Sequence, residues 1–292
     1  MGEKRPRSFY FLALFFIAYV LFLYGPMFAI YILSFQGPDG GLTFPMNGTS
    51  LVWFSKVFSG GGIVDIGAAF KRSLELGLVV MVLTVLLSVS AGMAFRKPFR
   101  GATVLFYVAI ASLIMPSIIT SLGIGLEFRL LDDFVNSLGV EGWTTGMGLF
   151  TSGLGAHLTW TLPFGLLIMF AIFNRFDGRL EEAARDLGAT PWQTFRHVVL
   201  PIILPSVVGI GLFGFTLSWD ELARSSQAIG SVNTLPLELQ GLTTTVTKPD
   251  IYALGTLTSA VSFLVIFTAL IVILVLQARQ RRHGSDAGKG MV

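Results

Sequence analysis

Six stretches of apolar residues, each long enough to cross a lipid bilayer, constrain the fold of this sequence more than any other feature. They lie near residues 11–34, 73–95, 102–126, 149–173, 200–219 and 252–276. A helical crossing takes about 20 residues. Lipid offers no hydrogen-bond partner to a free backbone amide, so each stretch is expected to be helical. The sequence therefore predicts an all-α polytopic membrane protein with six transmembrane helices.

The composition fits a chain whose main surroundings are membrane lipid. Hydrophobic residues make up 53% of the chain and charged residues only 13%, whereas an ordinary soluble domain has about 25% charged residues. The absence of cysteine excludes a disulfide scaffold, a cysteine-ligated metal centre and thiol catalysis. The formal net charge of +3 is small, so no nucleic-acid partner is expected.

The basic residues predict which side of the membrane each segment faces. With the N-terminus inside, 14 of the 20 Lys and Arg residues lie on the cytoplasmic side and six lie outside, as the positive-inside rule requires. Residues 1–10 then form a cytoplasmic tail, 11–276 a six-span transmembrane domain, and 277–292 a basic cytoplasmic tail that is expected to be disordered. The first span is expected to be retained, because its apolar run exceeds an ordinary signal-peptide core. The predicted outer loops are 35–72, 127–148 and 220–251.

One cytoplasmic loop, 174–199 between the fourth and fifth spans, carries a specific helical pattern. Leu180 to Leu187 contains good helix formers, with two acids in the first turn where the helix dipole favours them. Gly188 is placed to end this helix in a left-handed conformation. Thr190 and Pro191 are typical of an N-cap and a first helical residue, so a second helix should follow. The first helix would present one face suited to a partner's groove, formed by Leu180, Ala183, Ala184 and Leu187.

The spacing within this loop resembles a known family. Glu182-Ala183-Ala184, Gly188, Val198 and Leu200-Pro201 match the EAA loop of permease subunits in binding-protein-dependent ABC importers. The resemblance extends over roughly residues 70–280 and is closest to the spermidine/putrescine permease type. Further matching segments are Arg96-Lys97-Pro98-Phe99-Arg100-Gly101, Pro116, Leu162-Pro163-Phe164, Ser218-Trp219-Asp220-Glu221 and Thr234-Leu235-Pro236-Leu237.

The resemblance implies that this loop holds a coupling helix, which docks into a cytoplasmic ATPase dimer. It also implies a second permease subunit (a sister chain), an extracytoplasmic solute-binding protein, and a place in the bacterial cytoplasmic (inner) membrane. The simpler alternative is a solvated loop with two short helices. Carried onto this chain, the ATPase-coupling residues are Leu180, Glu182, Ala183, Ala184, Leu187, Gly188 and Trp192.

No motif for catalysis occurs in the chain. The sequence has no Gly-x4-Gly-Lys-Ser/Thr phosphate loop, no metalloprotease motif and no hydrolase nucleophile motif. We therefore expect no enzyme activity, no catalytic residue, no bound cofactor and no metal site in this chain. ATP and Mg²⁺ would be used by the partner ATPase.

Placing an ionisable side chain inside a span costs about 2.5–3.5 kcal/mol of membrane-insertion free energy. Each one found there is therefore expected to have a function or a hydrogen-bonding partner. His157 in the fourth span either lines the solute path or is a neutral histidine that bonds to a neighbouring helix. Glu75 near the outer end of the second span is expected to pair locally with Lys71 or Arg72.

Aromatic and acidic residues near the outer side are further candidates for the solute path. Trp160 lies close to His157, and Trp219, Asp220 and Glu221 end the fifth span. Adjacent carboxylates beside an aromatic ring suit a cationic amine. Interface anchoring and contact with the binding protein would explain them equally well. Arg224 adds a positive charge close by.

The leading hypothesis is an importer permease that forms half of the translocation path for a small polar solute, such as spermidine or putrescine. The alternative is an ion-coupled secondary transporter or a channel that works without ATP. Such transporters usually place buried charges or unwound helices in the middle of the membrane, and only His157 is a mid-span candidate here.

Overall fold

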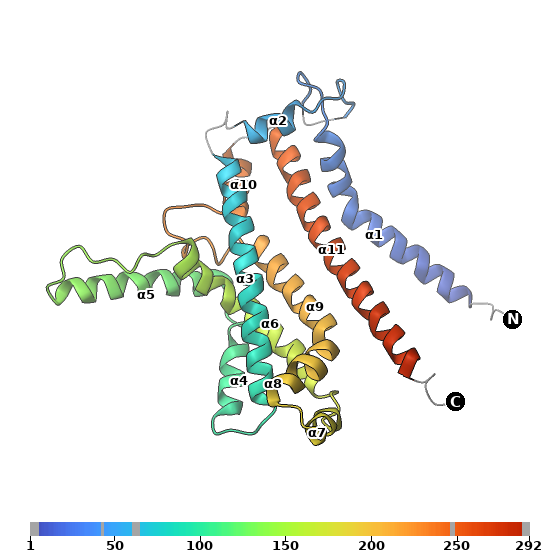
Figure 1. Cartoon of the computed structure of the whole chain (residues 1–292). Coiled ribbons are helices and arrows are strands. Elements are labelled where there is room, and N and C mark those ends of the chain that lie inside the picture. Colours follow the sequence, from blue (N-terminus) through green and yellow to red (C-terminus); the bar gives the residue numbers. More distant parts are fainter. Residues whose placement is uncertain (1–5, 42–43, 60–64, 246–248, 288–292) are drawn as a thin grey trace. The chain divides into compact units, whose positions relative to one another are not determined.

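The computed structural model describes residues 6–41, 44–59, 65–245 and 249–287, and the regular elements within these ranges are helices (Figure 1). In chain order they are α1 (Arg7–Leu33), α2 (Val52–Phe58), α3 (Ile66–Phe95), α4 (Ala102–Ala111), α5 (Ser117–Ser137), the π-helical turn η1 (Leu149–Gly153), α6 (Leu154–Phe173), α7 (Arg179–Asp186), α8 (Pro191–Thr194), the π-helical turn η2 (Phe195–Val199), α9 (Leu200–Trp219), α10 (Leu235–Thr245) and α11 (Pro249–Ala287).

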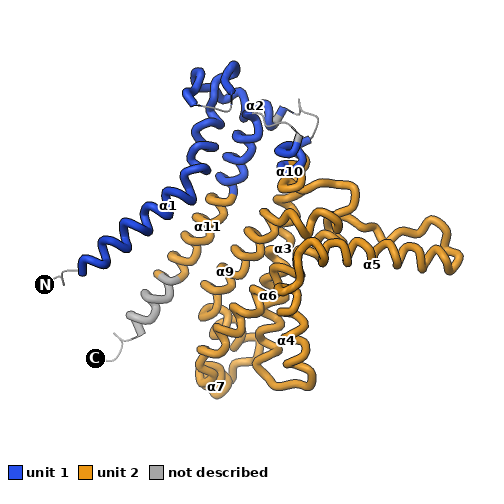
Figure 2. Tube along the Cα trace, turned by 180° about the vertical axis from the view of Figure 1, so that it is seen from behind, with its two compact units in different colours: residues 1–67, 239–261 blue, residues 68–238, 262–292 orange. Residues whose placement is uncertain are grey.

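The chain divides into two compact units, which Figure 2 shows in different colours. The first unit contains residues 1–67 and 239–261, and the second contains residues 68–238 and 262–292. All the residues of the cytoplasmic loop and of the solute-path candidates belong to the second unit, so the functional site lies within one unit.

In the first unit, the segment after α1 folds around Gln36. The Gln36 side chain donates to the Gly41 carbonyl at 2.8 Å and accepts from the Asn47 amide at 2.8 Å. The Trp53 indole donates to the Gln36 carbonyl at 2.8 Å. A Cβ atom at Gly40 would lie only 2.3 Å from the Gln36 side chain, so this turn requires glycine. The glycine-rich start of the first predicted outer loop is therefore folded.

Five helical runs are long and apolar enough to cross a membrane, which confirms five of the six predicted spans by length and composition. They are Arg7–Leu33, Ile66–Phe95, Leu149–Phe173, Pro191–Trp219 and Pro249–Leu276. Near the outer end of the second span, Lys71 and Glu75 form the predicted local ion pair, at 3.8 Å between Nζ and Oε1.

The predicted third span, 102–126, is wrong as a single helix. α4 ends at Ala111, and α5 begins after Pro116 and continues to Ser137, well beyond the expected end. Proline has no N–H for the carbonyl four residues earlier, and its ring clashes with that carbonyl in a continuous helix. That carbonyl belongs to Ser112, which accepts instead from the Arg224 guanidinium at 3.2 Å. α5 therefore projects away from the other helices of its unit (Figure 1).

The other boundaries differ in two further places. The second helix of the cytoplasmic loop is continuous with the fifth span, because η2 joins α8 to α9 without a break. α11 continues to Ala287, beyond residue 277, where the predicted cytoplasmic tail begins. This stretch contains alanine, glutamine and arginine, which are good helix formers. Residues 288–292 lie outside the described residues.

The core of the second unit is formed where α3, α6 and α9 approach one another closely. Met169 of α6 packs with Ile203 and Ile210 of α9, and all three are fully buried. A Cβ atom at Gly165 would lie 2.0 Å from the Ser88 hydroxyl of α3, and such small residues allow helices to pack tightly in membranes. This packing holds the ends of α3, α6 and α9 together on the side where the cytoplasmic loop begins and ends.

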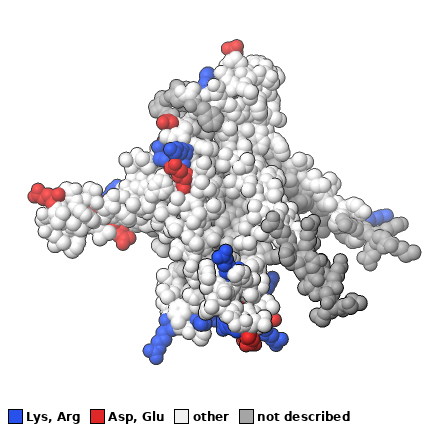
Figure 3. Space-filling view, in the orientation of Figure 1, with Lys and Arg blue, Asp and Glu red and all other residues white. Residues whose placement is uncertain are grey.

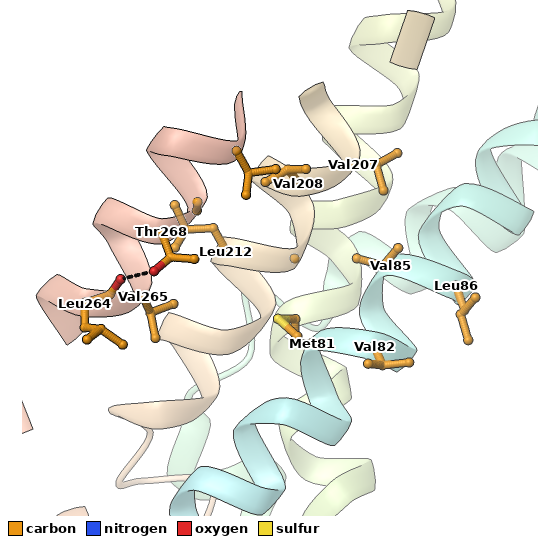
Figure 4. Close-up of a pocket in the computed structure, with 13 residues that line it drawn as sticks. Met81, Val82, Val85, Leu86, Val207, Val208, Leu212, Leu264, Val265 and Thr268 are labelled. Carbon is orange, nitrogen blue, oxygen red and sulfur yellow. Dashed lines mark hydrogen bonds between the residues drawn. The ribbon is translucent and has the colours of Figure 1, made fainter. Parts of the chain in front are cut away.

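A cavity of about 510 Å³ lies among α3, α9 and the part of α11 that belongs to the same unit (Figure 4). Its lining is apolar except for Thr268, and the Thr268 hydroxyl already donates to the Leu264 carbonyl at 2.7 Å. A polar solute would find no hydrogen-bonding partner there, so this cavity suits hydrocarbon and is not the candidate site.

Candidate functional site

The cytoplasmic loop contains the two helices that the sequence predicts. α7 ends in a Schellman motif, in which Ala189 N–H donates to the Ala184 carbonyl at 3.0 Å and Gly188 N–H donates to the Arg185 carbonyl at 2.8 Å. Gly188 has φ +83°, the left-handed conformation expected for it. This local prediction is confirmed.

The second helix begins with a capping box at the predicted residues. The Gln193 amide donates to the Thr190 hydroxyl at 3.3 Å, and the Thr190 amide donates to the Gln193 side chain at 2.8 Å. Pro191 occupies the first turn of α8, where its missing N–H costs nothing. The C-cap of α7 is Leu187 and the N-cap of α8 is Thr190, three positions later. A sharp turn of defined geometry therefore joins the two helices.

The two helices expose an apolar surface with a carboxylate beside it. Leu187 is 89% exposed, Trp192 is 64% exposed and Leu180 is 47% exposed. Glu182 and Ala183 are also exposed, whereas Ala184 is half-buried. We call the exposed set the docking surface: Leu180, Glu182, Ala183, Leu187 and Trp192. Six of the seven predicted coupling residues are thus exposed, Gly188 included. All seven lie in α7, in α8 or in the turn that joins them.

Basic side chains gather around the same turn. Figure 3 shows Lys and Arg side chains at the end of the unit where α7 and α8 lie. They come from the α3–α4 connection and from the first half of the loop, and include Arg96, Lys97, Arg100, Arg175, Arg179 and Arg185. Acidic phospholipid headgroups attract such a cluster.

Sequence reasoning missed the residue that anchors this loop. Glu181, next to the expected Glu182, is buried and accepts a charge-assisted hydrogen bond from Arg96 at 2.5 Å. The Arg96 guanidinium also lies over the rings of Phe173 and Phe176, at 4.8 and 5.0 Å from their centroids. The sequence shows two adjacent acids, and no sequence signal distinguishes the buried one from the exposed one.

The solute-path candidates lie at the opposite end of α6 and α9, within a network of hydrogen bonds. His157 is fully buried, with Nδ1 at 2.8 Å from the Ser218 hydroxyl and Nε2 at 2.9 Å from the Ser225 hydroxyl. These are the bonds expected of the alternative in which His157 bonds to a neighbouring helix. Ser218 belongs to α9 and Ser225 to the segment after it, so His157 ties that segment to α6.

The sequence indicated Arg224 only as a positive charge near the end of the fifth span, and its structural role was missed. Arg224 is fully buried, its guanidinium donates to the Thr159 hydroxyl and the Ser112 carbonyl, and it lies over the Trp160 ring at 4.9 Å from the centroid. Burial lowers the pKa of Arg224, and the nearby Glu221 carboxylate opposes this effect. Because Arg224 connects α6 with the break between α4 and α5, its positive charge points into the protein.

The residues that end the fifth span divide into two groups. Trp219 is buried and packs on Phe70 and Phe215, with ring centroids at 5.4 and 5.7 Å. The Glu221 carboxylate accepts from the Arg224 backbone amide at 2.8 Å. Asp220 reaches the surface, although the protein around it excludes enough water to raise the pKa of its carboxyl. Asp220 is therefore the exposed member of this group.

Comparison with known proteins gives one family and several named relatives. The family model described as "Binding-protein-dependent transport system inner membrane component" matches residues 84–283. The spermidine/putrescine transport system permease protein PotC of Haemophilus influenzae is 30% identical over 93% of this chain and 97% of its own length. The putrescine transport system permease protein PotI of Escherichia coli is 30% identical over 81% of each chain.

Solved structures with a similar fold are also transporters. A chain of a bacterial ABC transporter that imports the acidic polysaccharide alginate has a TM-score of 0.61 and 16% identity, over 94% of this chain and 95% of that one. A chain of the MetNI methionine ABC transporter has a TM-score of 0.55 and 18% identity, over 72% of this chain and 95% of that one. At these identities the likeness concerns the fold alone.

Proposed function

Because the chain belongs to the family of inner membrane components of binding-protein-dependent transport systems, we propose that it is the permease subunit of a bacterial ABC importer. In this proposal it forms half of the translocation path for a small polar solute. A separate ATPase dimer drives it, a sister permease completes the path, and an extracytoplasmic binding protein delivers the solute. The chain itself hydrolyses nothing.

The observation that carries the coupling part of this proposal is the docking surface on α7 and α8. Its apolar residues are largely exposed although the turn that presents them is held by two independent caps. Exposed leucine and tryptophan side chains on a rigid turn are typical of a surface that a partner covers. The surrounding basic residues favour the cytoplasmic side for this turn, which is the side where an ATPase meets ATP.

The best candidate for the solute is a polyamine. The relatives are named as spermidine and putrescine permeases, and the exposed carboxylate of Asp220 suits a cationic amine. The positive charge of Arg224 does not oppose this assignment, because its guanidinium is buried and hydrogen-bonded to Thr159 and Ser112.

The first experiment is co-purification of the chain from its native membrane, with identification of whatever accompanies it. We expect an ATPase and a second permease. The variants Gly188→Asp and Glu182→Lys should lose the ATPase and keep the second permease, because both changes lie on the turn and not in the helical core. Undiminished assembly and transport in both variants would refute docking at this turn.

A second experiment separates the importer from its alternative. The purified assembly is reconstituted in liposomes with radiolabelled putrescine and a loaded binding protein, with and without ATP. Uptake that requires ATP supports the importer. Uptake by the single chain without ATP would show an ion-coupled transporter or a channel instead. Replacement of Asp220 by Asn with unchanged uptake would remove this carboxylate from the solute path.

A further inference from the structure

The turn formed by α7 and α8 carries the docking surface, and we call it the docking turn. The ion pair between Arg96 and Glu181 joins this turn to the membrane-spanning helix α3. Arg96 directly follows α3, which ends at Phe95, and Glu181 lies in the first turn of α7. The Arg96 Nη1 atom lies 2.5 Å from Glu181 Oε1, and their side chains are only 22% and 11% exposed. The two residues are 85 positions apart in the sequence, so this contact connects elements that the chain itself does not connect.

Glu181 has a second, weaker partner within its own helix. Arg185 Nη2 lies 3.4 Å from Glu181 Oε2, and the Arg185 side chain is 58% exposed. An exposed pair within one helix contributes little because water and salt screen it. A short, partly buried pair is screened less and holds its geometry more firmly. Arg96 is therefore the partner that positions the Glu181 carboxylate.

The pair also involves the buried part of α7. Of the eight residues of α7, Glu181 is the one that is buried. Arg96 is held in turn by the aromatic rings of Phe173 and Phe176 at the end of α6, where a cation is attracted to the ring faces. The carboxylate of α7 thus reaches the ends of both α3 and α6 through one guanidinium.

We propose that Arg96 is a positioning residue that transmits movement of the docking turn to α3. This inference rests on the proposed function, because it requires an ATPase that moves α7. A partner that displaces α7 pulls on Glu181, and Glu181 moves the end of α3 with it. Without the guanidinium, α7 can still bind the ATPase through its exposed docking surface, but its displacement is no longer passed on to the helix.

The test compares the variants Arg96→Gln, Glu181→Gln and the double variant in the reconstituted assembly. Each should leave the affinity for the ATPase nearly unchanged. Each should lower solute uptake per ATP hydrolysed by about tenfold or more, since a hydrogen bond between charged groups is lost. The double variant should be no worse than either single one, because all three remove the same contact. Arg185→Gln is the matched control and should transport normally.

Restoring the link distinguishes transmission from general loss of structure. The chain has no cysteine, so Arg96→Cys with Glu181→Cys introduces a unique thiol pair. This variant should hydrolyse ATP with little uptake, and a bifunctional maleimide that spans the two thiols should restore uptake per ATP. Arg96→Lys, which keeps the charge but not the planar geometry, should lie between the wild type and Arg96→Gln.

The inference would be overturned by normal uptake per ATP in Arg96→Gln, by an additive loss in the double variant, or by cross-linking without any recovery. A loss of ATPase affinity equal to the loss of uptake would also contradict it, because Arg96 would then serve docking. Failure of the wild-type chain to bind any ATPase is a different result, and it would refute the proposed function itself.

Discussion

Replacement of Gly188 by alanine should weaken docking of the ATPase without disturbing the transmembrane helices. Gly188 has φ +83°, and a Cβ atom at this position would meet no other atom within 4 Å. The effect of alanine is therefore purely one of backbone conformation. A residue with a Cβ atom pays about 1–2 kcal/mol for the left-handed conformation.

That free energy acts on the equilibrium between the capped turn and turns of other shapes. A change of about 1–2 kcal/mol alters such an equilibrium about 5–30-fold. Where the capped turn is the form that binds, the apparent Kd for the ATPase rises in inverse proportion to the fraction of turns that keep the capped form. The full 5–30-fold effect is thus an upper value, reached when the capped turn becomes the minor form.

Two other variants serve as controls. Gly178→Ala places the same methyl group at the start of α7, where φ is −62°, ψ is −21° and the surroundings are equally open. Alanine adopts this conformation without strain, so we expect no loss of stability and no loss of ATPase binding. Gly188→Asn should bind better than Gly188→Ala, because asparagine tolerates the left-handed region.

The assay is equilibrium binding of the purified ATPase to the reconstituted permease, with hydrogen exchange at the Gly188 and Ala189 amides as a local measure. In Gly188→Ala these amides should exchange faster, because the Schellman hydrogen bonds open more often. Equal affinity in Gly188→Ala and Gly178→Ala, together with faster exchange in Gly188→Ala, would refute the reasoning. It would mean that the ATPase does not require the capped turn.

Three further predictions concern other contacts. Thr190→Ala removes half of the capping box and should cost the start of α8 about 0.5–2 kcal/mol, measured as faster exchange of the Gln193 amide; unchanged exchange would contradict the cap. Arg224→Ala leaves the half-buried Ser112 carbonyl without its donor, at a cost of up to about 1–3 kcal/mol, and should lower the thermal midpoint in detergent. An unchanged midpoint would show that the contact contributes nothing. Glu75→Gln removes an exposed ion pair within one helix and should change stability by less than about 0.5 kcal/mol; a large fall in the same melting assay would show a role that this pair does not explain.

Proline shows where sequence reasoning reaches its limit. Pro26, Pro163 and Pro205 lie inside the continuous helices α1, α6 and α9, whereas Pro116 follows the break between α4 and α5. All four lack the same N–H, so the sequence alone does not distinguish them. At Pro116 the carbonyl that would be orphaned is that of Ser112, and it accepts from Arg224, which is 112 residues further along the chain. A distant donor therefore stabilises this break.

The adjacent acids Glu181 and Glu182 make the same point for the candidate site. Both favour the first turn of a helix, which is why α7 could be predicted. Their roles differ because only Glu181 faces Arg96 at the end of α3. The spacing of the family motif indicated Glu182, which is exposed, and did not indicate the buried Glu181 beside it.

The sequence by itself determined the local features of this protein. Apolar length predicted five of the spans, Gly188 predicted the left-handed end of α7, and Thr190 with Pro191 predicted the start of α8. Each depends on residues within a few positions of one another. Tertiary structure decided which proline accompanies a break, which acid anchors the docking turn, and that Arg224 points inward. Those outcomes depend on hydrogen bonds between residues 85 or more positions apart, or 65 in the case of Thr159, and local patterns do not specify such partners.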